Sequence, residues 1–356
     1  MDVRWLFSCL PRLDWLQVEI SSDCTANCFY CPRTVYKNQW LSQHMEESLF
    51  CRLLPVFKKT HRVHLQGWGD PFTHPQFFHF ARLAKSAGCQ VGTTTNGMLL
   101  NEWWCEQLVE ANLDTIGFSL AGTGAENDRY RRGTRLEKVL SVIATIHGIK
   151  QRAGVDLPHI HIAYLLLKSG VQTVGRLPDL LRERGISQVV ISALDAIGNP
   201  SLAQEVIAPE DNEEKETLRR QLEEIVEAGR GVGLPIHYQL PARAPQPGDK
   251  QHHLEKESSL AITHPSWCTE NIQRAAFVGV TGKVSPCVFV NLPLTAPPPL
   301  STDFIERPYR PLVFGDISTT HFGKIWYSPS YASFRKAHQS GVIPNICQLC
   351  TKFSRQ

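Results

Sequence analysis

Short apolar runs alternate along the chain with segments in which apolar residues recur every three or four positions. Six runs have the length and composition of buried strands, at residues 16–20, 62–66, 90–94, 115–120, 159–167 and 188–194. The clearest helix spans 135–151, where Val139, Ile143 and Ile146 form one apolar stripe, and a more polar helix is predicted at 211–228. This alternation predicts a parallel sheet with crossover helices.

Residues suited to chemistry follow these predicted strands directly. Cys24 follows the first strand, Gly67 to Pro71 follow the second, Asn96 follows the third, and Ser119 lies at the end of the fourth. In α/β barrels the active site occupies the edge where the carboxyl ends of the strands meet. The pattern therefore predicts an α/β fold, a partial (β/α)6 TIM-like barrel, with its functional residues on one edge.

Composition divides the chain and excludes several classes of protein. With 356 residues and 42% hydrophobic content, the chain can bury the core of one large and one small domain. We expect a barrel at 1–240, a linker at 241–266 and a small α+β domain at 267–356, because the linker is rich in proline and the composition changes after it. The sequence lacks a bilayer-spanning or signal segment, and its net charge of +3 is too small for a nucleic-acid partner. A cytoplasmic location without membrane contact is predicted.

Three of the eleven cysteines, Cys24, Cys28 and Cys31, have the spacing C-x3-C-x2-C. Three thiolates from one short loop can hold three irons of a 4Fe-4S cube and leave the fourth iron open for a ligand. A zinc knuckle or a disulfide loop would be compatible with the same spacing. A reducing compartment favours metal sites over disulfides.

A second cysteine set lies near the C-terminus. A predicted hairpin at 277–290, with its turn at Thr281 and Gly282, lies between the first two members of the set. The set comprises Cys268, Cys287, Cys347 and Cys350. Four thiolates can ligate a second 4Fe-4S cube fully, and a four-cysteine zinc site is the alternative. The spacing of Cys9, Cys51, Cys89 and Cys105 indicates ordinary thiols.

The first cysteine motif resembles that of the radical S-adenosylmethionine (radical SAM) enzymes, and the second set resembles their SPASM or shortened twitch domain. The resemblance implies S-adenosylmethionine as a cofactor, bound through its amino and carboxylate groups to the open iron. It implies two 4Fe-4S clusters, one of them an auxiliary cluster for electron transfer. It also implies reductive cleavage to a 5'-deoxyadenosyl radical that removes hydrogen from a substrate, with electrons from a flavodoxin or ferredoxin.

Several residues match cofactor-binding positions of that family. The run Gly67-Trp68-Gly69-Asp70-Pro71 resembles the GGEP segment, whose backbone carbonyls bind the methionyl ammonium; Trp68 and Asp70 replace a glycine and a glutamate. Ser119-Leu120-Ala121-Gly122 resembles the SLDG stretch, with Ala121 in place of aspartate.

The remaining matches concern the carboxylate and the adenine. By the same resemblance, Arg131 would pair with the methionyl carboxylate, a task suited to a guanidinium. Tyr30, just before the third cysteine, would lie against the adenine, and Asn96 is a further candidate for that pocket.

The substrate is not identified by these residues. We expect a radical SAM oxidoreductase of the dehydrogenase type, acting on an unknown small molecule or peptide. A peptide-modifying maturase and a non-catalytic metal-binding or electron-carrier protein are the alternatives. With 23 residues before Cys24, we expect no leader-binding domain there, which does not exclude a peptide substrate because such domains can be separate proteins. Candidates for a general base are Lys168, Asp195 and His161, and the Pro-rich stretch 293–311 is expected to be a surface loop or a lid.

Overall fold

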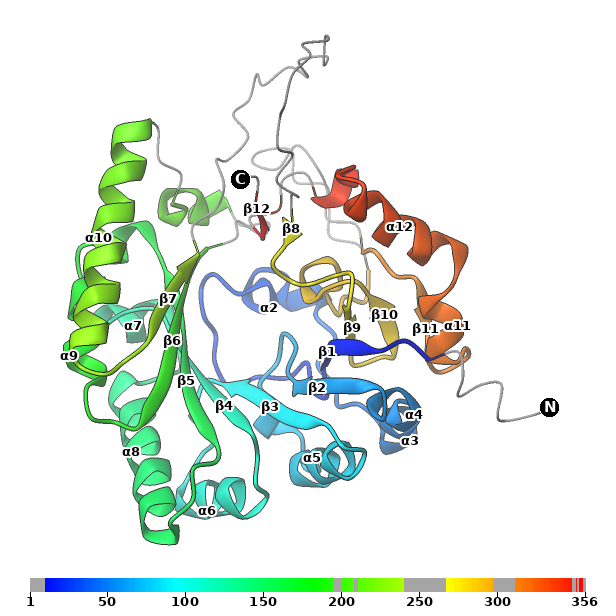
Figure 1. The fold of residues 1–356 in the computed structure, drawn as a ribbon, viewed down its shortest axis with the longest axis horizontal. Coiled ribbons are helices and arrows are strands. Elements are labelled where there is room, and N and C mark those ends of the chain that lie inside the picture. The colour runs from blue at the N-terminus through cyan, green and yellow to red at the C-terminus, as the bar shows by residue number, and fades with distance from the viewer. Residues whose placement is uncertain are drawn as a thin grey trace.

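The computed structural model describes residues 10–194, 200–207, 211–239, 267–296, 311–347, 350 and 352–354. Ten strands form one open, curved sheet in the order β11-β10-β9-β1-β2-β3-β4-β5-β6-β7 (Figure 1). The barrel strands are β1 (Leu13–Val18), β2 (Thr60–Leu65), β3 (Gln90–Thr95), β4 (Thr115–Leu120), β5 (His159–Leu166), β6 (Ile186–Ala193) and β7 (Ile236–Gln239). All neighbours from β1 to β7 are parallel, which confirms the predicted sheet.

β7 adds a parallel strand beside β6 that the sequence pattern did not predict. Of its four residues, Ile236 alone is buried, so the apolar signal is too short to stand out.

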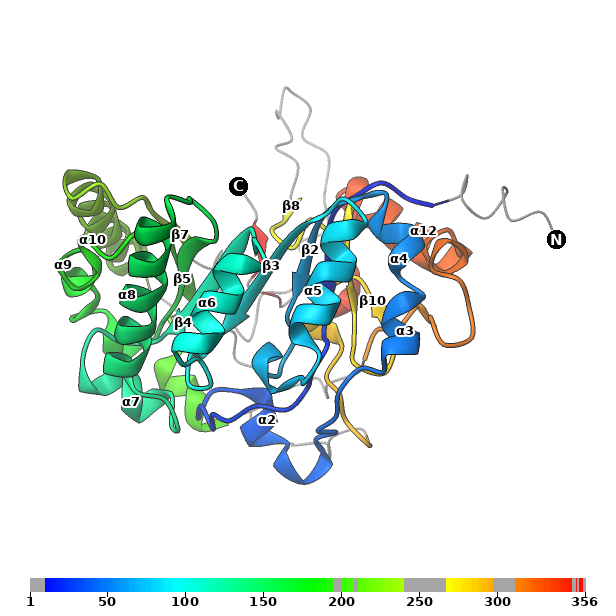
Figure 2. The same ribbon diagram turned by 90° about the horizontal axis from the view of Figure 1, so that it is seen from below.

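Helices cover the outer face of the sheet (Figures 1 and 2). The longer ones are α5 (Phe77–Ser86), α6 (Glu102–Glu110), α8 (Leu136–Ala153) and α10 (Asn212–Gly231). Shorter ones are α3 (Glu47–Cys51), α4 (Leu54–Phe57), α7 (Ala125–Tyr130) and α9 (Leu177–Leu181), whereas α2 (Pro32–Val35) lies inside the curve of the sheet in the view of Figure 1. Both helices predicted from the sequence, at 135–151 and 211–228, are present as α8 and α10 with small shifts at their ends. α8 ends where Gly154 adopts the left-handed conformation, with φ of 65°.

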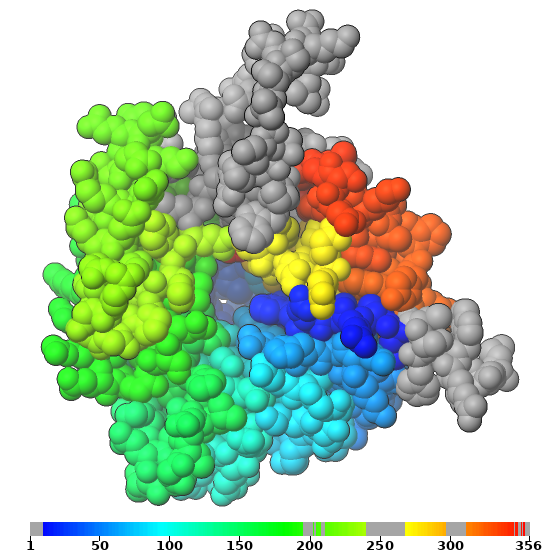
Figure 3. Space-filling model, viewed as in Figure 1, coloured from blue at the N-terminus to red at the C-terminus, as the bar shows by residue number. Residues whose placement is uncertain are grey.

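The two faces of the sheet differ in burial. In β5, Ile160, Ile162 and Tyr164 are buried on one face, whereas His161 and Ala163 on the other face are only partly buried. The apolar core therefore lies between the sheet and the outer helices, while the inner face carries polar residues. The space-filling view is hollowed at its centre, where the dark blue and green parts of the chain face each other (Figure 3).

The C-terminal part continues the barrel sheet. β9 (Ala275–Val278) pairs in parallel with β1, and β10 (Lys283–Ser285) and β11 (Gly315–Asp316) follow as antiparallel neighbours. The predicted hairpin is confirmed, with shorter strands and a 3-10 turn at Val288–Val290. Helices α11 (Phe322–Trp326) and α12 (Pro329–Gln339) pack beside it, and β8 (Trp267–Cys268) pairs with β12 (Phe353–Ser354).

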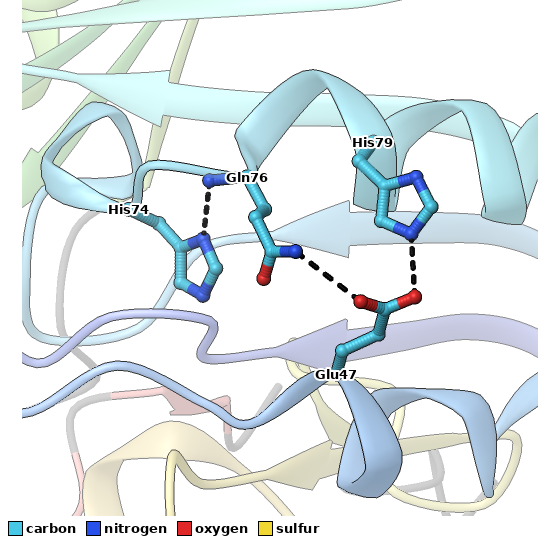
Figure 4. Close-up of polar contacts among 4 residues, drawn as sticks. All are labelled: Glu47, His74, Gln76 and His79. Carbon is cyan, nitrogen blue, oxygen red and sulfur yellow. Dashed lines mark hydrogen bonds and ion pairs between the residues drawn. The ribbon is translucent and has the colours of Figure 1, made fainter.

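The segment that follows the Gly67–Pro71 run is held against α3 by polar contacts (Figure 4). Glu47 at the start of α3 accepts hydrogen bonds from the Gln76 amide at 3.2 Å and the His79 imidazole at 2.8 Å. The His74 ring accepts from the Gln76 backbone N–H at 3.0 Å, and its Nε2 is 3.1 Å from the Met45 carbonyl oxygen. These contacts anchor the chain between the second strand and α5.

Some predicted features lie outside the described residues. They are the linker 241–266, residues 297–310 of the Pro-rich stretch, Cys9 and Asp195. Within the described ranges, every helix is too short or too polar to cross a membrane.

Candidate functional site

Cys24, Cys28 and Cys31 lie on one loop between β1 and α2. Cys28 is buried and the other two thiols are half-buried. The Cys31 backbone N–H donates to the Cys28 carbonyl at 3.1 Å, and Cys31 directly precedes the first residue of α2. The loop is therefore a tight turn, and its three thiols are close enough that Cys28 acts on Cys24, and both act on Cys31.

The loop is also anchored to the chain after α7. The Asn27 N–H donates to the Arg132 carbonyl at 2.6 Å, and the Phe29 N–H donates to the Tyr130 carbonyl at 3.1 Å. The Arg33 guanidinium closes the turn by donating to the Ala26 carbonyl and, at 3.0 Å, to the Asn27 side chain.

Burial raises the pKa of the Cys24 thiol to about 11 and that of the Cys31 thiol to about 12, with a further contribution from the neighbouring Cys28 in each case. Thiols in such a place become thiolates readily only when a metal supplies positive charge. Three converging, desolvated thiols therefore fit an iron-sulfur cluster.

The Gly67–Gly69 turn packs tightly against the end of β1 and the start of the cysteine loop. A Cβ atom on Gly67 would lie 2.3 Å from the Cγ of Glu19, and one on Gly69 would lie 2.4 Å from the Asp23 carbonyl oxygen. The Asp70 N–H donates to that same carbonyl at 2.7 Å. Only glycine permits this close approach, and the turn is half-buried.

Asp70, in the slot of the family's glutamate, points into the protein. Its carboxylate accepts hydrogen bonds from the Phe72 N–H at 3.1 Å, the Thr95 hydroxyl at 2.8 Å and the Asn96 N–H at 2.9 Å. Burial raises the pKa of this carboxyl group, and these bonds oppose the shift. The side chain thus ties the end of β2 to the end of β3.

Asn96 extends this network to the cysteine loop. Its Nδ2 lies 3.5 Å from the Cys24 sulfur and 3.3 Å from the Thr25 hydroxyl. The predicted residues Asp70 and Asn96 are therefore brought near Cys24 by adjoining strand ends, while Gly67 lies against Glu19.

Arg131 lies on the other side of the cysteine loop. Its buried guanidinium donates to the Tyr30 hydroxyl at 2.6 Å. Burial opposes its charge, but the neighbouring Tyr30, Cys28 and Cys24 raise the pKa of Arg131 overall. Burial also raises the pKa of the Tyr30 phenol, which stays protonated. A fixed cation thus lies near Cys28 and Cys24.

Two further predicted residues are Ser119, which lies on β4, and Trp68, which lies within the glycine turn. Ser119 is half-buried on β4, opposite Ala163 of β5. Where the family has aspartate, the Ala121 N–H donates to the Asn127 side chain at 3.0 Å. The Trp68 indole donates to carbonyls of the C-terminal part.

The second cysteine set is assembled from three separate segments. Cys268 is opposite Phe353 in the β8–β12 pair, which brings it to the chain that follows Cys350. The Cys350 N–H donates to the Cys347 carbonyl at 3.2 Å, and Cys287 follows β10.

These four thiols influence one another. Burial is the largest cause that raises the pKa of Cys268 and Cys347, each to about 12, and the charge of Cys350 adds to both shifts. The pKa of Cys287 is likewise raised by burial, then by Glu270, Cys268 and Cys350. Across the described residues, groups of three or more His, Cys, Asp or Glu side chains with the spacing of a single-ion site are absent. In a 4Fe-4S cube, by contrast, each thiolate binds its own iron.

Comparison with known proteins agrees with this arrangement. Residues 18–162 match the radical SAM superfamily, and residues 268–351 match the SPASM iron-sulfur cluster-binding domain. A tungsten-containing aldehyde ferredoxin oxidoreductase cofactor-modifying protein of Pyrococcus furiosus is 24% identical over 192 residues, 51% of this chain and 52% of that protein. The match thus spans about half the length of this curated relative.

Solved structures share the fold over most of the chain. Streptococcus suis SuiB bound to S-adenosylmethionine has a TM-score of 0.63 at 15% identity, covering 92% of this chain and 68% of SuiB. Native anSMEcpe with bound AdoMet has a TM-score of 0.62 at 16% identity, covering 96% and 89%.

Fold and sequence together define an iron-sulfur protein of the radical SAM superfamily. The chain carries a radical SAM domain on a partial TIM barrel, followed by a SPASM iron-sulfur domain. The first domain implies S-adenosylmethionine and a 4Fe-4S cluster, and the second implies additional iron-sulfur chemistry.

Glu19 is a residue of this site that the sequence reasoning missed. It is buried, and its carboxylate accepts from the Trp68 N–H at 2.8 Å and the Val280 N–H at 3.1 Å. The signal was present in the sequence, since Glu19 is a charged residue between the apolar Val18 and Ile20.

Of the candidate bases, His161 faces the inner side of the barrel. Burial lowers its pKa to about 4, and its Nδ1 is buried without a hydrogen-bond partner. Lys168 is exposed in a short 3-10 turn after β5.

Proposed function

We propose that the protein is a radical SAM oxidoreductase with two 4Fe-4S clusters. Cys24, Cys28 and Cys31 would hold the first, and the second cysteine set would hold an auxiliary cluster. When bound, the first cluster supplies the electron that cleaves S-adenosylmethionine to methionine and a 5'-deoxyadenosyl radical. The observation that carries the proposal is the position of the three thiols between Asn96, which contacts Cys24, and Arg131, whose charge is stabilised by Cys28 and Cys24.

The protein's own residues bind and orient the cofactor in this proposal. The Gly67–Gly69 backbone would accept hydrogen bonds from the methionyl ammonium, and Arg131 would pair with the carboxylate. Tyr30 holds the guanidinium in place through the 2.6 Å hydrogen bond and would border the adenine. The open barrel would receive the substrate on its polar inner face.

The net reaction proposed is oxidation of the substrate, with its remaining electron passed to the auxiliary cluster. An external flavodoxin or ferredoxin would supply the reducing electron.

A peptide-modifying function is the second candidate. It is supported by the fold shared with SuiB bound to precursor peptide SuiA and with anSMEcpe bound to Cp18Cys peptide.

Anaerobic reconstitution followed by iron and sulfide counting tests this proposal. We expect about eight irons per chain, and about four in a variant with Cys24, Cys28 and Cys31 all changed to alanine. Cys51→Ser is the matched control, because Cys51 lies at the end of α3 outside both sets, and it should keep about eight. Dithionite and S-adenosylmethionine should then release 5'-deoxyadenosine from wild type and the control only.

Two other results would contradict the proposal. Zinc, or only about four irons in the wild type, would overturn the auxiliary cluster. A fully loaded protein that releases no 5'-deoxyadenosine would favour a non-catalytic electron carrier.

A further inference from the structure

Trp68 contacts both parts of the chain at once. Its backbone belongs to the glycine turn, and its N–H donates to the Glu19 carboxylate at 2.8 Å. Its indole Nε1 donates to the Val288 carbonyl at 3.2 Å and the Asn291 carbonyl at 3.1 Å. A glycine in this position would make none of the indole contacts.

The two carbonyls belong to the turn that directly follows Cys287. The Trp68 ring meets the Phe289 ring edge-on, with 6.0 Å between centroids and 85° between planes. The Lys352 ammonium lies 5.4 Å from the centroid of the same Phe289 ring, two residues after Cys350. One indole therefore contacts the segment of Cys287 directly and the segment of Cys350 through Phe289.

Glu19 makes a second link between the glycine turn and the C-terminal part of the chain. One of its oxygens binds the Trp68 N–H, and the other accepts from the Val280 N–H in the turn of the β9–β10 hairpin. The carboxylate also fills the space beside Gly67, so the turn has little room to shift independently of the hairpin. A small movement of the glycine turn must then be taken up by the indole or by the carbonyls that bind it.

We propose that Trp68 is a positioning residue that couples S-adenosylmethionine binding at the glycine turn to the auxiliary-cluster segment 287–291. This inference rests on the proposed function, since it takes the glycine turn and the second cysteine set as binding sites. Coupling between two sites is reciprocal, so loading of the auxiliary site must also change the affinity for S-adenosylmethionine.

Hydrogen-deuterium exchange on the full, iron-loaded chain, with and without S-adenosylmethionine, tests the coupling. In the wild type we expect the ligand to slow exchange at residues 66–70 and also at 287–291. Trp68→Phe keeps an aromatic ring but removes the donor to both carbonyls. It should retain the protection at 66–70 and lose the protection at 287–291.

Trp40→Phe is the matched control. The Trp40 indole also donates to a backbone carbonyl, that of Ser22 at 2.9 Å, but it makes no bond to the 288–291 carbonyls. This variant should keep both protections. A purely structural role for Trp68 would raise exchange at 287–291 equally with and without the ligand, so the ligand-dependent difference separates the two roles.

The wild type alone can overturn the coupling. Protection at 66–70 without any change at 287–291 would contradict it, as would a Trp68→Phe protein in which both protections persist. If S-adenosylmethionine slowed exchange at neither segment of the iron-loaded wild type, the proposed cofactor site itself would be wrong, and the coupling would be wrong with it.

Discussion

The carboxyl group of Glu19 is buried. Burial raises its pKa from an ordinary value of 4.5 to about 7, against the lowering effect of the hydrogen bonds from Trp68 and Val280. Between those two values the folded chain holds a proton that the unfolded chain releases. Stability therefore falls as the pH rises from about 4.5 to about 7, and this group causes no further change above that.

Replacing Glu19 with glutamine removes this pH dependence. The free energy of unfolding of Glu19→Gln relative to wild type should rise by on the order of 3 kcal/mol between pH 4.5 and pH 8. Denaturant unfolding of the full chain across this pH range measures the difference. Glu106→Gln, at an exposed position of α6, is the control and should show a flat difference. An equally flat difference for Glu19→Gln would show that this carboxyl titrates normally.

The Asp70 carboxylate holds the ends of β2 and β3 together. Asp70→Ala leaves three donors without an acceptor and should cost about 2–4 kcal/mol of stability, whereas Asp70→Asn should cost about half as much. Thermal or denaturant unfolding measures both. If Asp70→Asn kept its stability but lost S-adenosylmethionine affinity, the carboxylate would be a ligand contact instead.

The C-terminal end of α8 shows how a single glycine ends a helix. Its last turn is closed by Gly154 in the left-handed conformation, and the N–H of Gly154 donates to the Gln151 carbonyl. A Cβ atom there would meet no neighbour within 4 Å, so the cost of a side chain would be purely conformational.

We therefore expect Gly154→Ala to lower the free energy of unfolding by about 1 kcal/mol. Gly175→Ala is a matched control, because Gly175 also has open space around it and is not among the positive-φ glycines. The control should lie within about 0.5 kcal/mol of wild type. Equal losses in the two variants would argue against a conformational cap at Gly154.

Across the molecule, β1 is the strand that joins the two parts. It lies between β2 and β9 and leads into the cysteine loop (Figure 1). Leu16 and Val18 of β1 are fully buried, and the strand's hydrogen bonds on one side are made by β9. The barrel edge is thus completed by a segment from the far end of the sequence.

A chain ending after Gln239 should therefore not behave as an independent domain. Without β9, β1 becomes an exposed edge with unpaired backbone groups, which promotes aggregation and loss of cooperative unfolding. Size-exclusion chromatography and unfolding curves of the truncated and full chains measure this. A monomeric truncated chain that unfolds cooperatively would show that the β1–β9 pairing is dispensable.

Much of the fold follows from local signals in the sequence. Six of the seven barrel strands, and the helices at 136–153 and 212–231, were predicted to within a few residues, because apolar periodicity reports directly on burial. The short β7 was missed, since four residues with one buried side chain carry too little pattern. The three clustered cysteines were found because their ligand spacing lies within one loop.

Contacts between distant segments were decided only by the tertiary structure. That β9 pairs with β1, and that the Trp68 indole reaches carbonyls next to Cys287, could not be inferred from spacing. A backbone carbonyl is the same acceptor at every residue, so the sequence carries no mark of which one a distant donor will meet. Periodicity and ligand spacing are local properties that a chain displays in its sequence, whereas strand order and the partners of Glu19 and Trp68 arise only when the segments pack together.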